Sequence, residues 1–411
     1  MRRTNGIWAG AGLLLSMMSL STAAALTPQQ LLTWGVNVYS KTKSSLQAPG
    51  SNIFSETAFL SGARSGGDSG FSYVWPAATQ FRVENQLAKM DSATYAPILK
   101  AYSDELYTRY WTSTGAGGYR SGVSAGATRF YDDNAHMAVS LAEAYRFTGD
   151  SQYLDKAKQT FAFVLSGADT VGGGGTYFST SDHSFKDSAG TLQGARAALM
   201  LYQATGTTSY LTDATRLYNW AKTHTQQADG TFMEKLYLTG PKAFTAGDST
   251  LVNFAGFGIE ANIEFYKATS TKSYLTEAQR IATTCLTRYF NTTPGAINDE
   301  GFWAFELVDA LDDLSRADGN LNWLTKAQGA MQWLHTNRED PNGHYGTLWG
   351  RGGLQGLSPL SSWNLNEQAS VAQSYLQTGL TPEPGAGLLL GAMGMVALGR
   401  RRRARLFTAK R

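Results

Sequence analysis

The sequence predicts an all-α protein built as an (α/α)6 toroid of helical hairpins. A segment repeats along the chain, and each copy joins one apolar stretch to the next through a short polar turn. Apolar residues recur at the three- and four-residue spacing of amphipathic helices. No alternating strand pattern extends over a long stretch of the chain.

The repeat is clearest in residues 145–157, 202–214 and 266–278, and a looser copy spans residues 315–327. One aromatic position recurs in all four copies, at Tyr153, Tyr210, Tyr274 and Trp323. These positions are 57, 64 and 49 residues apart, which is too uneven for a solenoid of identical units. Helical hairpins joined by loops of variable length fit the spacing better.

Each copy follows the same physical logic. A helix ends in a Thr-Gly turn, where glycine supplies the left-handed cap, and a Ser, Asp or Thr then caps the next helix. Apolar residues of that second helix share one face, as in Tyr153, Leu154, Ala157, Phe161 and Val164. We therefore expect about twelve helices, six in an inner and six in an outer ring, starting near residues 28, 78, 93, 132, 151, 187, 208, 250, 272, 302, 320 and 363.

Connections within a hairpin are short, whereas those between hairpins are long. The long connections all lie at the N-termini of the predicted inner helices and span residues 111–131, 167–186, 227–249, 290–301 and 337–362. Loops of this length in a compact domain are usually functional. We therefore expect the active site on the face from which they emerge.

The composition excludes some classes of partner. The net charge is +3, but much of the basic excess lies in the last dozen residues, so the body is near neutral. A nucleic-acid-binding protein would spread basic residues over a folded face, and we expect none here. The single Cys285 excludes an intrachain disulfide and is expected in the core. Abundant aromatics suit a neutral, hydroxyl-rich ligand, although they also fill large helical cores.

Both ends of the chain carry targeting patterns. Arg2 and Arg3, an apolar stretch and three small residues at 23–25 predict a signal peptide over residues 1–25. At the other end, Thr381-Pro382-Glu383-Pro384 precedes an apolar run of about 15 residues (385–399) and an arginine cluster. A spanning helix needs about 17 to 25 residues, so this run is short. The arginines would keep its end on the cytoplasmic side of the membrane.

The order of triplet, apolar run and arginines resembles the PEP-CTERM sorting signal, which exosortase systems of Gram-negative bacteria recognise. The resemblance implies export to the periplasm, outer surface or medium, with transient insertion of residues 385–399 in the inner membrane. An ordinary C-terminal membrane anchor is the alternative. We therefore expect a signal peptide at 1–25, a toroid at 26–379 and a sorting segment at 380–411.

Asp132 and Asp133 are the strongest catalytic candidates. They fall at the start of a predicted inner helix, on the face with the long loops. Glycosidic cleavage uses two carboxyl groups, one protonated and one ionised. Neighbouring like charges move their pKa values apart, and the helix dipole favours the ionised member. Two acids at this position are also a good helix cap and first turn, so the pattern alone leaves both interpretations open.

The run Tyr131-Asp132-Asp133-Asn134-Ala135, followed by Leu141-Ala142-Glu143-Ala144-Tyr145, resembles the signature of glycoside hydrolase family 76. Residues 172–179 and Lys186 resemble the next segment of that family. The resemblance implies an (α/α)6 fold and retaining, endo-acting cleavage of α-1,6-mannan, with no cofactor. It also implies that Asp132 is the nucleophile and Asp133 the general acid/base. It extends over most of residues 70 to 378 and is sharp only over about 131 to 195.

The sequence departs from the family pattern at three places. His136 stands where the family has Trp or another aromatic residue, Asn253-Phe254-Ala255-Gly256 replaces Tyr-Asn-Gln-Gly, and Phe302-Trp303-Ala304-Phe305 replaces Phe-Lys-Gly-Ile-Phe. We expect these positions to border the substrate subsites. Glycoside hydrolysis is therefore a firmer prediction than mannan as the substrate.

Seven residues are candidates for substrate binding: Tyr131, Asn134, His136, Tyr177, Lys186, Trp303 and Trp75. His136 either touches substrate or fills a helix interface, and the two tryptophans either stack on sugar rings or belong to the core. The five histidines show no metal-binding spacing. A second pair, Asp312-Asp313, falls late in an inner helix and is expected to be solvated or capping. Two other functions remain open: a non-catalytic glycan-binding or matrix protein, and a transglycosylase using the same aspartate pair.

Overall fold

The computed structural model describes residues 26–290, 295–350 and 358–381. The signal peptide predicted at residues 1–25 lies outside the described residues, and so does nearly all of the sorting segment. Among the described residues, no helix is long and apolar enough to cross a membrane.

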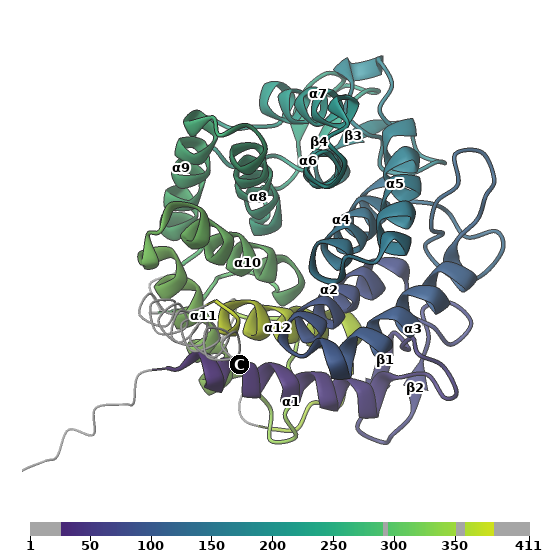
Figure 1. The fold of residues 1–411 in the computed structure, drawn as a ribbon, viewed down its shortest axis with the longest axis vertical. Helices are drawn as coiled ribbons and strands as arrows, with labels where there is room; N and C mark the ends of the chain where they lie inside the picture. Colours follow the sequence, from purple (N-terminus) through teal and green to yellow (C-terminus); the bar gives the residue numbers. More distant parts are fainter. Residues whose placement is uncertain (1–25, 291–294, 351–357, 382–411) are drawn as a thin grey trace, which may run out of the picture.

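The described residues form twelve α-helices in two concentric rings (Figure 1). The inner ring consists of α2 (Val74–Met90), α4 (Tyr131–Thr148), α6 (Ser188–Thr205), α8 (Val252–Thr269), α10 (Gly301–Asp318) and α12 (Leu365–Gly379). The outer ring consists of α1 (Pro28–Leu46), α3 (Ser92–Tyr110), α5 (Ser151–Ser166), α7 (Thr208–His224), α9 (Lys272–Arg288) and α11 (Leu321–Arg338). The predicted fold class is confirmed, and the predicted helix starts agree with the observed ones to within four residues.

The inner ring closes on itself. Each inner helix packs against the next, from α2 through α4, α6, α8 and α10 to α12, and α12 packs back against α2. The outer helix of each hairpin packs against its inner partner, as α5 does on α4 and α7 on α6. Because every inner helix has two inner neighbours, its side chains are buried over most of its circumference. In α6, for example, all residues from Ser188 to Leu201 are buried.

The helix ends follow the capping logic of the repeat. Gly149 and Gly206 end α4 and α6 with positive φ angles of 72° and 70°, the conformation that glycine adopts without steric cost. Asp150 then caps α5 by accepting a hydrogen bond from the Gln152 backbone N–H at 3.0 Å. In the third copy the left-handed position is taken by Ser270. The turns therefore keep their geometry although their residues vary.

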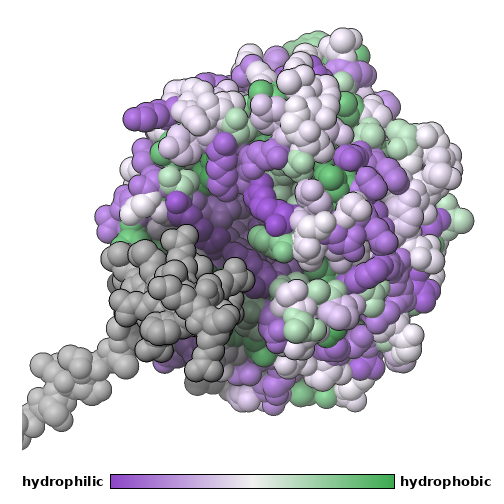
Figure 2. All heavy atoms as spheres, in the orientation of Figure 1, coloured by the Kyte–Doolittle hydropathy of each residue, from purple (hydrophilic) through white to green (hydrophobic). Residues whose placement is uncertain are grey.

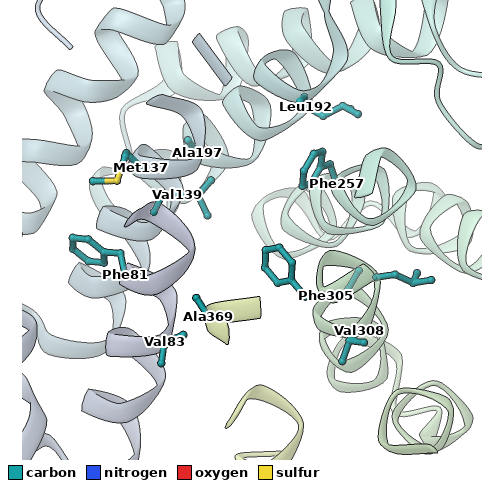
Figure 3. Close-up of a cluster of buried hydrophobic side chains, with 14 of the residues drawn as sticks. Phe81, Val83, Met137, Val139, Leu192, Ala197, Phe257, Phe305, Val308 and Ala369 are labelled. Atoms are coloured by element: carbon teal, nitrogen blue, oxygen red, sulfur yellow. The ribbon is translucent and has the colours of Figure 1, made fainter. Parts of the chain in front are cut away.

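The core lies between the two rings and between neighbouring inner helices. Apolar side chains from all six inner helices contribute to it (Figure 3), including Phe81, Val139, Leu192, Phe257, Phe305 and Ala369. Cys285 on α9 is fully buried, as predicted. Arg82 and Arg196 are also buried here, because they meet carboxylates that project from neighbouring inner helices.

Six short strands lie in the long loops of the described chain, and the sequence did not predict them. The strands β1 (Thr57–Phe59), β2 (Arg64–Ser65) and β6 (Ser362–Asn364) form one sheet in the order β2-β1-β6. A second sheet, in the order β3-β4-β5, contains β3 (Phe185–Asp187), β4 (Lys235–Tyr237) and β5 (Ala246–Gly247). Both sheets join loops from different hairpins, so they fix the loops relative to one another.

Candidate active site

One large cavity opens at the N-terminal ends of the inner helices. Its volume is about 790 Å³, and it is lined by residues from the first turns of all six inner helices. The lining includes Trp75, Asp132, Asp133, His136, Asp187, Asn253, Phe254, Phe302, Trp303, Glu306 and Asn366. Figure 2 shows one face of the ring of helices, with a hollow near its centre and many hydrophilic side chains around it. The cavity lies on the face of the molecule where the sequence predicts the site.

Asp132 and Asp133 occupy the first turn of α4 and both line the cavity. The residue before the helix is Phe130, which has no side-chain acceptor, so the helix N-terminus receives no side-chain cap from it. The two aspartates therefore lie where the positive end of the helix dipole meets the cavity. His136 is on the same face of α4, three and four residues further along, and also lines the cavity.

Burial affects the two carboxyl groups differently. Desolvation raises the pKa of Asp132 to about 6, and the backbone N–H groups of Asp132 and Asp133 partly offset this effect. Desolvation raises the pKa of Asp133 well above its usual value, and the neighbouring Asp132 and Asp187 raise it further. The two groups titrate as a coupled set, in which Asp132 ionises first and Asp133 keeps its proton. This is the division of protonation that an acid and a nucleophile require.

His136 stands at the floor of the cavity beside a network of buried charges. Its Nδ1 lies 3.8 Å from Glu306 Oε1, and burial lowers the pKa of His136 to about 4. Arg82 donates to Glu306 at 2.8 Å and to Asp309 at 2.9 Å. Arg196 donates to Glu143 at 3.1 Å. Both arginines also pair with Glu260, so this network of charges connects α2, α4, α6, α8 and α10.

Aromatic side chains form the walls of the cavity. Trp75 and Trp303, from the starts of α2 and α10, stack on each other with ring centroids 5.1 Å apart. Across the cavity lining, Phe130 meets Phe178 edge-on at 4.9 Å. Faces of this kind can pack against the apolar side of a sugar ring, while nearby oxygens receive its hydroxyl groups. The placement of Trp75, His136 and Trp303 agrees with the sequence-based prediction that they border the site.

Four of the predicted substrate-binding residues do not line the cavity. Asn134 is fully buried, and its side chain holds the backbone of Tyr119 through bonds of 2.7 and 2.9 Å. Tyr131 stacks on Phe163 with centroids 4.8 Å apart. Tyr131 and Asn134 are three residues apart, so their side chains share one face of α4. Their contacts with Phe163 and Tyr119 show that this face points away from the cavity.

Lys186 and Tyr177 fix the loop that precedes α6. Lys186 Nζ is buried, donates to Asp169 at 2.7 Å and lies 3.3 Å from the centroid of the Tyr177 ring. The Tyr177 hydroxyl donates to the same carboxylate at 2.7 Å. These residues therefore support the wall of the site instead of lining it.

Sequence reasoning missed four acidic residues that line the cavity: Glu56, Asp187, Glu234 and Glu306. Asp187 and Glu306 carried a usable signal, because each lies within the first turns of an inner helix, as Asp132 does. Glu56 and Glu234 lie in loops whose course the sequence did not define. The Asp312-Asp313 pair was wrongly expected to be solvated or capping: Asp312 is fully buried and bonds to Arg316 and Thr381.

The geometry suits cleavage of a glycosidic bond, and comparisons with known proteins agree. Residues 37–299 match the model of glycosyl hydrolase family 76. No match was found among curated proteins. Among solved structures, a family 76 α-mannanase from Bacteroides thetaiotaomicron is 26% identical, with a TM-score of 0.77 over 85% of this chain and 95% of that chain.

A second match is the α-1,6-mannanase of Salegentibacter sp. HEL1_6, which is 19% identical with a TM-score of 0.72 over 85% of this chain and 99% of that one. A structure of its inactive variant, with two adjacent aspartates changed to asparagine, contains α-1,6-mannotriose (19% identity, TM-score 0.73, over 85% and 99%). The family match extends over well more than half of the chain and includes Asp132 and Asp133. The chain therefore belongs to glycosyl hydrolase family 76 and is a glycoside hydrolase.

Proposed function

We propose that this protein is a retaining endo-glycosidase that cleaves an α-linked, mannose-containing polysaccharide of the α-1,6-mannan type. Asp132 is the nucleophile and Asp133 the general acid/base. The observation that carries the proposal is that both carboxyl groups open into one aromatic-lined cavity of about 790 Å³, where the pKa of Asp133 is raised further than that of Asp132.

The reaction has two balanced steps. Asp133 donates its proton to the glycosidic oxygen while an Asp132 oxygen attacks the anomeric carbon, so the leaving sugar departs and an ester to Asp132 forms. The Asp133 carboxylate then takes a proton from water, whose oxygen attacks the anomeric carbon and releases Asp132. Two successive inversions retain the anomeric configuration. A sugar hydroxyl in place of water in the second step would make the same pair a transglycosylase.

Relatives support the choice of substrate. The Bacteroides thetaiotaomicron relative is an α-mannanase, and the Salegentibacter relative is an α-1,6-mannanase. Changing two adjacent aspartates in the latter gave an inactive protein. The departures at His136, Asn253 and Trp303 all border the cavity of this chain, so the preferred polymer is the part of the proposal most in need of testing.

The test incubates the toroid domain, residues 26–379, with α-1,6-mannan and a panel of other α-glycans, beside the Asp132→Asn and Asp133→Asn variants. We expect wild type to release oligosaccharides from α-1,6-mannan and both variants to lose at least about a hundredfold in rate. Release of sugar from none of the glycans would favour a non-catalytic glycan-binding or matrix protein. Full activity of either variant would overturn the assignment of roles.

We also propose that the protein acts outside the cytoplasm. The basic and apolar N-terminal stretch supports export, and the C-terminal triplet, apolar run and arginines support handling by an exosortase. Fractionation of cells that express the full chain, beside a chain ending at residue 381, tests both steps. We expect the full chain in the membrane before processing and at the surface or in the medium afterwards. Retention of the full chain in the cytoplasm would contradict the proposal.

A further inference from the structure

Asp187 is a third carboxyl group at the catalytic pair. It ends β3, caps α6 and is 4% exposed, and it lines the same cavity as Asp132 and Asp133. Its Oδ2 accepts the Gly190 backbone N–H at 2.6 Å. Its own backbone N–H donates to Thr176 O at 2.8 Å, and the Thr191 hydroxyl donates to its carbonyl at 2.6 Å. The carboxyl group is therefore held in one place before any substrate arrives.

The first turn of α6 lies directly against the first turn of α4. The Gly190 Cα hydrogen faces Asp132 so closely that a methyl group there would stand 3.1 Å from Asp132 N and 3.3 Å from Asp132 Cα. Because Asp187 bonds to Gly190, its carboxylate is fixed beside the pair although it comes from a different helix. The three groups occupy adjoining N-termini of two inner helices.

Among the described residues, no Lys or Arg pairs directly with this group of carboxyls, although Lys235 acts on Asp187 from beyond ion-pair distance. Lys235 is opposite Asp187 in the β3–β4 register, but its Nζ pairs with Glu234 at 3.2 Å and with Asp248 at 3.0 Å. In the described part of the chain, no Lys or Arg forms an ion pair with Asp132, Asp133 or Asp187. Three neighbouring buried carboxyls without a direct ion-pair partner oppose one another's ionisation, so they cannot all ionise at neutral pH.

The surroundings decide which of the three keeps its proton. The backbone N–H groups of Asp132 and Asp133 favour the Asp132 anion. Burial and the neighbouring Asp132 raise the pKa of Asp187 well above its usual value, and the Gly190 N–H and Lys235 offset part of this increase. Asp133 receives no such stabilisation, and the neighbouring Asp132 and Asp187 both oppose its ionisation. The other titratable groups that face the cavity are Glu56, Tyr73, Glu234, His136 and Glu306.

We propose that Asp187 is a positioning residue that acts through Asp133: its carboxylate opposes the ionisation of the general acid and thereby keeps that acid protonated at higher pH. The inference rests on the proposed function, since it needs Asp133 to be the acid. Asp187 then has two roles: its side chain caps α6, and its charge acts on Asp133.

The experiment measures kcat/KM against pH for the full-length wild-type protein and its Asp187→Asn variant, on the α-glycan that wild type cleaves. Asparagine caps a helix as well as aspartate does, so the variant removes charge and keeps the cap. We expect the alkaline limb to move to lower pH by about one unit. A substrate with a dinitrophenolate leaving group needs no acid, and its first step should show no such movement.

Asp150→Asn is the matched control, because Asp150 caps α5 in the same way and does not line the cavity. Its alkaline limb should stay where the wild-type limb is. An Asp187→Asn profile that coincides with wild type would overturn the inference, and so would a rise in KM without movement of the limb. Should Asp187→Asn fail to fold by circular dichroism, Asp187→Ser, which also keeps a capping oxygen, gives the same test. Absence of any cleavage by wild type would contradict the proposed function itself.

Discussion

Gly190 on α6 touches the backbone of Asp132 on α4. A methyl group on Gly190 would stand 3.1 Å from Asp132 N, 3.3 Å from Asp132 Cα and 2.8 Å from the Thr176 hydroxyl. Backbone atoms cannot move aside as the end of a flexible side chain can. The position of the proposed nucleophile is therefore set by the packing of two inner helices as well as by its own helix.

The Gly190→Ala variant should lose activity while it stays folded. Alanine favours helix by up to about 1 kcal/mol over glycine, which offsets part of the strain. Displacement of Asp132 by a fraction of an ångström or more should lower kcat about 10- to 100-fold. Kinetics and urea unfolding on the same sample measure both effects.

Gly194→Ala, one turn further along α6, is the control for that variant. Its methyl group would meet only the side chains of Val164 at 3.1 Å and Leu217 at 3.4 Å. We expect kcat close to that of wild type. Equal loss of activity in the two variants would show that α6 packing, and not the contact with Asp132, matters.

Arg82 should be essential for stability. It pairs closely with Glu306 at 2.8 Å and Asp309 at 2.9 Å, and it lies 3.8 Å from Glu143 and Glu260, which Arg196 also pairs with; all these carboxylates are buried. Arg82→Met would leave the buried Glu306 and Asp309 without their cationic partner and should lower the free energy of unfolding by about 3–5 kcal/mol. Urea unfolding followed by tryptophan fluorescence measures the loss.

Lys158→Met provides the comparison for an exposed pair. Lys158 lies 3.5 Å from Asp155 on the surface of α5, and such pairs contribute less than about 1 kcal/mol. If Arg82→Met lowers the free energy of unfolding no more than Lys158→Met does, the buried network of charges does not stabilise the ring of inner helices as expected.

His136 should make the folded protein less stable in acid. Burial lowers its pKa in the folded state to about 4, from a usual value of 6.5. Between these values the unfolded chain binds a proton that the folded chain does not, so the free energy of unfolding falls as the pH falls. His136→Gln removes this effect, and wild type should lose roughly 3 kcal/mol more than the variant between pH 7.5 and 4. Parallel pH dependence of the two unfolding free energies would contradict the burial of a neutral His136.

The sequence predicted the rings because the repeat encodes them locally. Each hairpin carries its own cap, turn and apolar face, so the helix starts could be placed within a few residues. The two small sheets could not be predicted in this way. Their strands have only two or three residues, and β1 pairs with β6 across about 300 residues of chain, so they depend on the closed ring.

The sequence predicted the cavity residues that belong to one motif on α4. It missed the acidic residues that the fold brings to the cavity from other helices and loops. Asp132, Asp133 and His136 share one face of α4, whereas Tyr131 and Asn134 share the other, and the motif does not reveal which face meets the cavity. Strand alternation likewise turns Lys186 away from the side of β3 that Asp187 faces. The sequence therefore led to Lys186 as a substrate-binding candidate, whereas its neighbour Asp187 is the residue that lines the cavity.

The most direct test of the central claim is the anomeric configuration of the product that azide forms with the Asp132→Ala and Asp133→Ala variants. Both variants receive an α-oligomannoside with an activated leaving group, and nuclear magnetic resonance identifies the glycosyl azide. Without its nucleophile, Asp132→Ala should yield the β-azide by direct attack. Without its acid/base, Asp133→Ala should form the ester to Asp132 and then the α-azide. The reverse assignment of azides, or the same anomer from both variants, would contradict Asp132 as nucleophile and Asp133 as acid/base.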